Sequence, residues 1–162
     1  MKKLLKIFQK MKPSREEIIR RLKAYFDIRE LVCPHTYKRF GEKAWIFYRT
    51  EQLHTILVLR EEIFKKPMIG NNYHRGGKFD ERGNRCNLCP LVKSQKKAYI
   101  SPHCSFAGND FDVFGYTAQE ARDKIIREQG KLPYNIRLEA DVNWLHVDCY
   151  DDGKGKVYSF KA

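Results

Sequence analysis

The chain has 162 residues, of which 42% are hydrophobic, 13% aromatic and 32% charged. This composition excludes an intrinsically disordered protein, and the length suits one domain with a substantial core. The 32 lysines and arginines outnumber the 20 acidic residues and give a formal charge of +12, so we expect anionic partners such as nucleic acid, acidic lipid or the polymers of a bacterial wall.

The N-terminal segment is basic and partly apolar. Lysines interrupt the apolar positions of residues 1–10 and no small-residue cleavage site follows, so we assign no signal peptide and expect a basic helical lead-in over 1–26. Ser14 and Glu17 have the spacing of a capping box, which predicts a helix to about Phe26. No stretch of the chain predicts a transmembrane helix.

The middle of the chain combines a helix with a long loop. Apolar residues at helical spacing predict a second helix over 51–64, which Pro67 ends. Residues 68–73 have the pattern of a short strand. The glycine-rich, polar run 76–86 predicts a long loop, and long loops in compact domains are usually functional.

The remainder of the chain alternates strands with one helix. Thr117 and Glu120 form another capping box, which predicts a helix ending near Gly130. Helices followed by hairpins predict an α+β domain, with N-terminal helices packed on a mostly antiparallel sheet. The strands are expected at 99–100, 109–114, 135–139, 143–150 and 156–160.

The five cysteines are an odd number, which argues against a full disulfide framework. Cys86 and Cys89 have the spacing of half a structural zinc site or of a local disulfide. The sequence offers no clear second half, so thiols without a metal or redox role are the simplest interpretation of this pair.

Two histidines and a carboxylate carry the clearest chemical pattern. His103 and Asp110 lie seven residues apart, and His146 follows on a separate predicted strand. Two histidines and one carboxylate are the ligand set of a catalytic zinc site, which keeps its fourth position open for water. A single histidine in a strand is more often a hydrogen-bonded core or surface residue, so the prediction depends on the three together.

These motifs resemble those of the zinc D-alanyl-D-alanine metallopeptidases, the peptidoglycan carboxypeptidases and endopeptidases that include phage endolysins and share a fold with the hedgehog signalling domain. The family motif Ser-x-His-x-x-Gly-x-Ala-x-Asp is matched at Ser, His and Asp by residues 101–110. A second motif, Trp-Val-His-x-Asp, is matched by residues 144–148. The family's Ser-Gly-Tyr-Arg element resembles residues 71–75, shifted by one. The similarity covers residues 66–150 as the metallopeptidase core of a single domain, 1–162.

The resemblance implies a hydrolase whose Zn²⁺ is held by the two histidines and Asp110. Many relatives carry an acidic base three positions before the last histidine, where this chain has Asn143, and an amide cannot accept the proton of water. Other branches place a glutamate six or so residues before that histidine. Glu139 is therefore the expected base and Asp141 the second choice, although both also fit as solvated carboxylates beside a turn.

Further positions are expected to face the substrate. The resemblance implies that Arg75 holds a substrate carboxylate or the reaction oxyanion, because its planar fork pairs bidentately with a carboxylate. Tyr73 and Trp144 are expected to shape the cleft, with aromatic core packing as the alternative. Ser101 is expected near the substrate and, like Asp148, as a group that orients a ligand ring, with a strand-edge charge as the alternative for Asp148.

The spacer of the first motif departs from the family pattern. Phe106 and Gly108 stand where relatives have Gly and Ala. We therefore expect the tight turn between the first two ligands to use Gly108 and Ala107, because glycine enters left-handed conformations freely.

The expected function is zinc-dependent hydrolysis of a peptide bond in the stem or cross-link peptides of bacterial peptidoglycan. The protein is expected to be a monomer, made in the cytoplasm without a signal peptide and acting on the cell wall once released, with no specific nucleic-acid partner. One alternative is a metal-binding but inactive structural or attachment protein of a bacteriophage. Another is a basic nucleic-acid-binding module, suggested by basic residues beside aromatics at 38–40 and 96–99.

Overall fold

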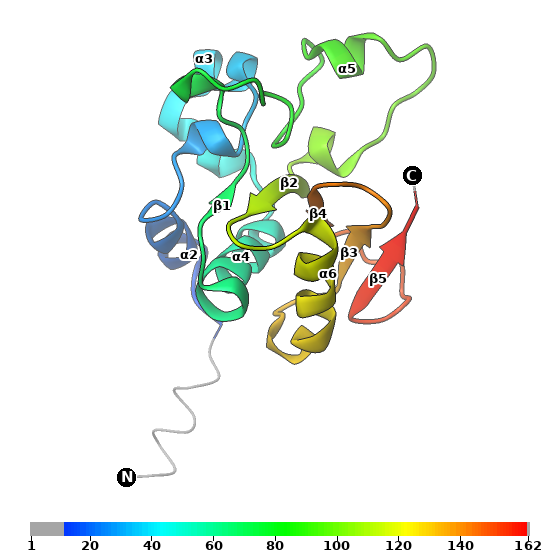
Figure 1. Ribbon diagram of the computed structural model, residues 1–162. Coiled ribbons are helices and arrows are strands. Elements are labelled where there is room, and N and C mark those ends of the chain that lie inside the picture. Colours follow the sequence, from blue (N-terminus) through cyan, green and yellow to red (C-terminus); the bar gives the residue numbers. More distant parts are fainter. Residues whose placement is uncertain (1–11, 162) are drawn as a thin grey trace.

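The computed structural model describes residues 12–161, so residues 1–11 of the expected lead-in lie outside the described part. Five strands form one sheet in the order β1-β2-β4-β3-β5. The neighbours β1/β2, β2/β4 and β4/β3 are antiparallel, whereas β3/β5 is parallel. The expected α+β class with a mostly antiparallel sheet is therefore confirmed (Figure 1). The elements are α2 Arg15–Leu22, α3 Pro34–Phe40, α4 Thr50–Val58, β1 Met68–Ile69, α5 Pro90–Lys93, β2 Gly108–Val113, α6 Ala118–Arg127, β3 Ile136–Glu139, β4 Leu145–Asp148 and β5 Val157–Phe160.

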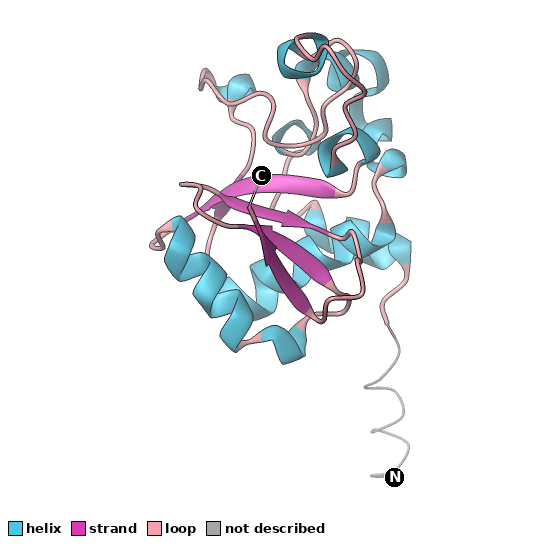
Figure 2. Cartoon of the chain, turned by 90° about the vertical axis from the view of Figure 1, so that its right-hand side faces the viewer, coloured by secondary structure: helices cyan, strands magenta, loops and turns pink. Residues whose placement is uncertain are grey.

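The sheet separates two layers. Helices α4 and α6 lie on one side of it, and the short helices α3 and α5 with their connecting loops lie on the other (Figures 1 and 2). Leu145 and Val147 of β4 belong to the hydrophobic core, together with Leu53 of α4 and Ile125 of α6. Because side chains alternate along a strand, the residues between them in sequence face the opposite layer.

Helix boundaries follow the capping signals. Ser14 Oγ accepts from the Glu17 N–H at 3.2 Å, and α2 starts at Arg15, the residue after Ser14. Thr117 and Glu120 form a reciprocal capping box at the start of α6. Helix α4 continues as a π-helical segment to Phe64, as the apolar spacing predicted.

One strand prediction was wrong, and another was too long. Residues 99–100 belong to no strand, and the Ile100 side chain is 86% exposed. The strand expected over 68–73 is only Met68–Ile69, and residues 73–75 form a 3₁₀ turn instead.

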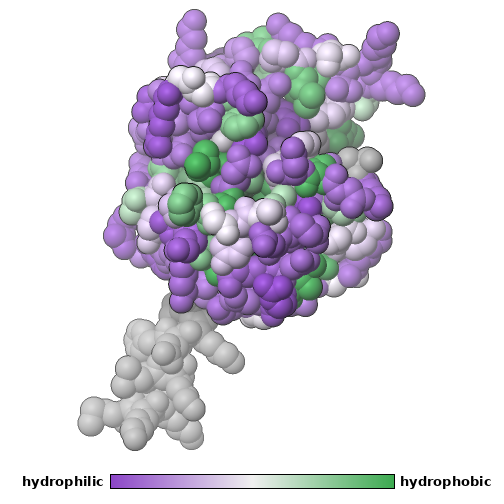
Figure 3. All heavy atoms as spheres, viewed as in Figure 1, coloured by the Kyte–Doolittle hydropathy of each residue, from purple (hydrophilic) through white to green (hydrophobic). Residues whose placement is uncertain are grey.

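The face shown in Figure 3 is mostly hydrophilic, with scattered apolar side chains. Among the described residues, none of the helices has the length and apolar character that a membrane crossing requires.

Candidate metal centre

Three buried side chains converge from three elements. Asp110 on β2 and His146 on β4 are direct partners in the antiparallel register. His103 comes from a 3₁₀ turn, Pro102–Ser105, that precedes β2. Ser101 caps this turn, because its Oγ accepts from the His103 N–H at 3.3 Å. All three candidate ligands are at most 5% exposed.

The candidate ligand atoms form a triangle of the size that a metal ion requires. His103 Nε2 lies 3.3 Å from His146 Nδ1 and 3.4 Å from Asp110 Oδ1, and the third edge, between His146 Nδ1 and Asp110 Oδ1, is 2.7 Å. Zinc bonds of about 2.0–2.1 Å in tetrahedral geometry separate ligand atoms by about 3.3 Å. The donor set therefore fits a divalent ion, and the short edge between His146 Nδ1 and Asp110 Oδ1 would lengthen when the ion binds.

The outer nitrogen of each histidine is held by an acceptor. His103 Nδ1 lies 2.7 Å from the Gly83 carbonyl oxygen, and His146 Nε2 lies 2.9 Å from Asp148 Oδ2. An N–H donated outward leaves the inner nitrogen with the lone pair that a metal needs. Hydrogen bonds of this kind are the usual support of metal-binding histidines, and they are present on both rings.

Arginines hold both carboxylates of the centre. Arg137 donates to Asp148 from Nε at 3.0 Å and from a terminal nitrogen at 3.1 Å, and Arg85 donates to Asp110 Oδ2 at 3.3 Å. Burial by itself would raise the pKa of Asp110, but the two histidines hold it well below its usual range. Burial also works against the charged form of His146, yet its hydrogen bonds to the two aspartates raise its pKa to about 9, so a metal that binds at Nδ1 must displace the proton shared with Asp110. Asp110 is thus ionised at neutral pH, the form that binds a cation.

The cluster opens onto a cavity of about 500 Å³, within the size range of ligand sites. Ser101, Glu139 and Trp144 line it, so the structure brings these three expected residues to the candidate ligands. The other lining residues are Arg85, Leu91, Tyr99, Ile100, Pro102, His103, Asp110, Arg137, His146 and Phe160.

Three other expected residues do not line this cavity. The Arg75 side chain is 68% exposed and lies 3.8 Å from the Glu30 carboxylate. Tyr73 donates to the Val32 carbonyl at 3.4 Å. Asp141 sits in a left-handed turn with φ of 61° and pairs with Lys161 at 2.6 Å. Local partners therefore occupy these side chains, and the expectation that they meet the substrate gains no support from their placement.

Sequence reasoning missed Arg85 and Arg137. Arg137 and Glu139 lie two residues apart on β3 and therefore share a face of the strand. This spacing could have identified Arg137 once Glu139 was chosen. Arg85 lies in the long loop predicted at 76–86, where local sequence gives no orientation.

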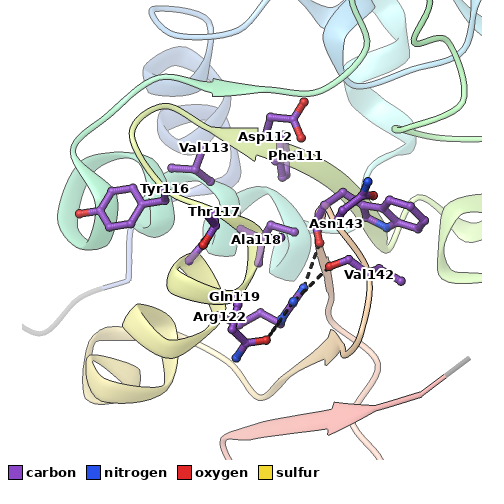
Figure 4. Close-up of a pocket in the computed structure, with 13 residues that line it drawn as sticks. Phe111, Asp112, Val113, Tyr116, Thr117, Ala118, Gln119, Arg122, Val142 and Asn143 are labelled. Carbon is purple, nitrogen blue, oxygen red and sulfur yellow. Dashed lines mark hydrogen bonds between the residues drawn. The ribbon is translucent and has the colours of Figure 1, made fainter.

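Asn143 lines a different cavity of about 470 Å³ between β2, the start of α6 and the segment before β4 (Figure 4). Arg122 fixes that segment by donating to the carbonyls of Val142 and Trp144, each at 3.1 Å. Asn143 therefore lines a cavity other than that of the candidate ligands. Trp144 lines both cavities.

The turn between His103 and Asp110 corrects an expectation. Phe106, not Gly108 or Ala107, adopts the left-handed conformation, with φ of 55°. Its ring lies 5.5 Å from that of Phe47 and 5.4 Å from that of Tyr48, between centroids. Aromatic packing thus holds a residue other than glycine in this conformation. Gly108 instead begins β2, where an added Cβ would meet Pro102 Cβ at 2.7 Å.

No family model, curated protein or solved structure matches this chain.

Proposed function

We propose that this protein is a zinc-dependent peptidase of bacterial peptidoglycan, of the D-alanyl-D-alanine metallopeptidase type with a hedgehog-like fold. The observation that carries the proposal is the triangle of His103, Asp110 and His146, with both outer ring nitrogens held by acceptors. A triad with three protein ligands beside an open cavity is typical of catalytic zinc sites. The motif spacing around the triad supports the choice of family.

The two histidines and Asp110 would hold the zinc. When bound, zinc supplies a Lewis acid that polarises a carbonyl group and makes water more acidic. Glu139 lines the same cavity and is free to act as the general base, taking a proton from water and returning it to the leaving amine. Arg85 and Arg137 line the same cavity, where they pair with Asp110 and Asp148 and so hold these two carboxylates in place.

The direct test is hydrolysis of purified peptidoglycan, with mass spectrometry of the released peptides. We expect hydrolysis by the purified protein, loss with a chelator and recovery with zinc. His103→Ala and His146→Ala should abolish zinc binding at the triad and hydrolysis. A wild-type protein that binds no zinc at the triad, or that binds zinc and cleaves no peptidoglycan bond, would contradict the proposal.

Glu139→Gln tests the base. The amide cannot accept a proton, so we expect hydrolysis to fall roughly 10²- to 10⁴-fold while zinc content stays unchanged. Asp141→Asn is the matched control, because Asp141 faces Lys161 outside the cavity, and it should retain near wild-type activity. Equal losses in the two variants would remove Glu139 from this role.

A second candidate is a metal-binding protein without catalysis, such as a structural protein of a phage particle. Asn143 favours it, because this residue is an amide and lines a separate cavity. Zinc binding at the triad without hydrolysis of any peptidoglycan preparation would select this candidate.

A further inference from the structure

A second cluster of metal-binding side chains lies outside the cavity described above. Cys33 and His35 come from the start of α3, and Cys86 and Cys89 come from the loop before α5. One donor atom from each of the four lies within 4.8 Å of the others. The Cys86/Cys89 pair therefore has the second half that the sequence did not reveal, the Cys33-Pro34-His35 segment.

The spacing within this cluster suits an ion at its centre. The Sγ atoms of Cys86 and Cys89 are 3.9 Å apart, and Cys89 Sγ lies 3.8 Å from His35 Nδ1. Zinc–sulfur bonds of about 2.3 Å in tetrahedral geometry place sulfurs about 3.8 Å apart. A disulfide needs about 2.05 Å, and all five cysteines are free thiols. The Leu88 N–H also donates to Cys86 Sγ at 3.4 Å.

Three thiols and one imidazole are a complete tetrahedral ligand set. Structural zinc sites are closed by four protein ligands, whereas catalytic sites leave one position open. Cys33 and Cys89 are buried, and Cys86 and His35 are partly buried. This cluster therefore has the composition of a structural site, unlike the triad of two histidines and an aspartate.

The segment 83–86 connects the two clusters. The Gly83 carbonyl accepts from His103 Nδ1, and the Asn84 side chain donates to the His103 carbonyl at 3.1 Å. On the other side, the Cys33 N–H donates to the Asn84 carbonyl at 3.1 Å, and Arg85 reaches Asp110. Anything that fixes Cys86 against Cys33 thus also fixes the groups that orient His103.

We infer that Cys33, His35, Cys86 and Cys89 bind a structural zinc ion, which joins the start of α3 to the 83–86 segment and thereby positions His103. The zinc site itself does not depend on the proposed peptidase function. Only its effect on catalysis rests on that function.

The test is metal content and cobalt spectroscopy of the full-length chain. Native mass spectrometry of the wild type should show two zinc ions. Cobalt in place of zinc should give an intense thiolate-to-metal charge-transfer band in the near ultraviolet. The His103→Ala/His146→Ala variant should keep this band and one zinc. Cys86→Ser/Cys89→Ser should lose the band, whereas Cys104→Ser, a cysteine outside the cluster, should retain it.

The Cys86→Ser/Cys89→Ser variant tests the site only if it folds without this zinc, so His35→Cys provides a second test that keeps four ligands. Four thiolates still form a closed set, so this variant should fold, keep its zinc and show a stronger charge-transfer band. Absence of the thiolate band from the folded wild type, or its persistence in Cys86→Ser/Cys89→Ser, would overturn the inference. A thiolate band without peptidoglycan hydrolysis would leave the inference standing and count against the proposed function alone.

Discussion

At the scale of single residues, the candidate metal centre depends on hydrogen bonds outside the ligand set. Asp148 is fully buried, accepts from His146 and is itself held by Arg137 through two hydrogen bonds. Burial by itself would raise the pKa of Asp148, but His146 and Arg137 keep it lowered. An ionised carboxylate at this position makes the imidazole a better donor to a metal.

Asp148→Asn should weaken zinc binding at the triad by roughly 10- to 100-fold, because loss of an outer partner of a ligand histidine has an effect of this size. Competition with a chromophoric chelator measures the affinity. Asp112→Asn is the matched control, since Asp112 also pairs with an arginine, Arg82 at 2.6 Å, but contacts none of the three ligands. Wild-type affinity in Asp148→Asn would show that this carboxylate does not support the site.

Tyr48 supports the strand that carries Asp110. Its hydroxyl donates to the Leu31 carbonyl and accepts from Asn109 Nδ2 at 3.0 Å, next to the candidate ligand. Tyr48→Phe would leave the buried Asn109 Nδ2 without this partner, whereas the Leu31 carbonyl would keep the Asn84 N–H. We therefore expect a loss of about 1–2 kcal/mol in the free energy of unfolding at pH 7. Urea denaturation measures this loss.

The pH dependence of this variant follows from the same burial. Burial raises the pKa of the Tyr48 phenol above its ordinary value. Above about pH 10 the unfolded chain loses this proton while the folded protein keeps it, so the wild type loses stability as pH rises. The Tyr48→Phe variant has no such proton, and the difference in stability between the two proteins should narrow above about pH 10. A difference that stays constant well above that pH would contradict the assignment.

At the scale of elements, the segment 83–86 is tied to the segment before α3 by close backbone contact. Val32 and Asn84 form a parallel bridge, and the Asn84 N–H donates to the Leu31 carbonyl at 2.7 Å. A Cβ at position 83 would overlap that carbonyl group. Glycine is therefore required here by the close approach of two backbones, and its own carbonyl orients His103.

Gly83→Ala should force these two segments apart. We expect a loss of about 2 kcal/mol in the free energy of unfolding and weaker zinc binding at the triad, because the acceptor of His103 Nδ1 moves. Thermal unfolding and chelator competition measure the two effects. Gly130→Ala is the control, since a Cβ there meets open space, and both quantities should stay at their wild-type values. Unchanged behaviour of Gly83→Ala would show that the contact relaxes without consequence.

The sequence predicted elements well where local chemistry determines them. Thr117 with Glu120 marked the start of α6, and apolar spacing marked the helix that ends at Phe64. The sequence could not reveal that Cys33 and Cys86 meet, because they lie 53 positions apart and Cys33-Pro34-His35 lacks the spacing of a recognised metal motif. Ile100 shows the converse, an apolar residue in a strand-like pattern that the fold leaves exposed.

At the scale of the whole molecule, the sheet brings together Asp110 and His146, which lie far apart in the sequence. β2 and β4 are neighbours, and their register sets Asp110 opposite His146. The apolar residues of β4 pack toward α4 and α6, so the polar residues face the layer of loops that supplies His103. A slip of one residue in the pairing of β4 would turn His146 to the core face, so the burial of Leu145 and Val147 holds the register that forms the site.

The proposed function predicts that the net charge of +12 draws the protein to the bacterial wall. Electrostatic attraction to anionic wall polymers is screened by salt, because the screening length falls from about 30 Å at 0.01 M to about 3 Å at 1 M. We therefore expect the fraction of protein that sediments with purified cell walls to fall steeply over this range. Walls stripped of their anionic polymers are the control and should bind less at low salt. Wall binding that does not change with salt concentration would assign recognition to the cavity alone. Salt-sensitive binding to DNA, without binding to walls, would favour a nucleic-acid partner.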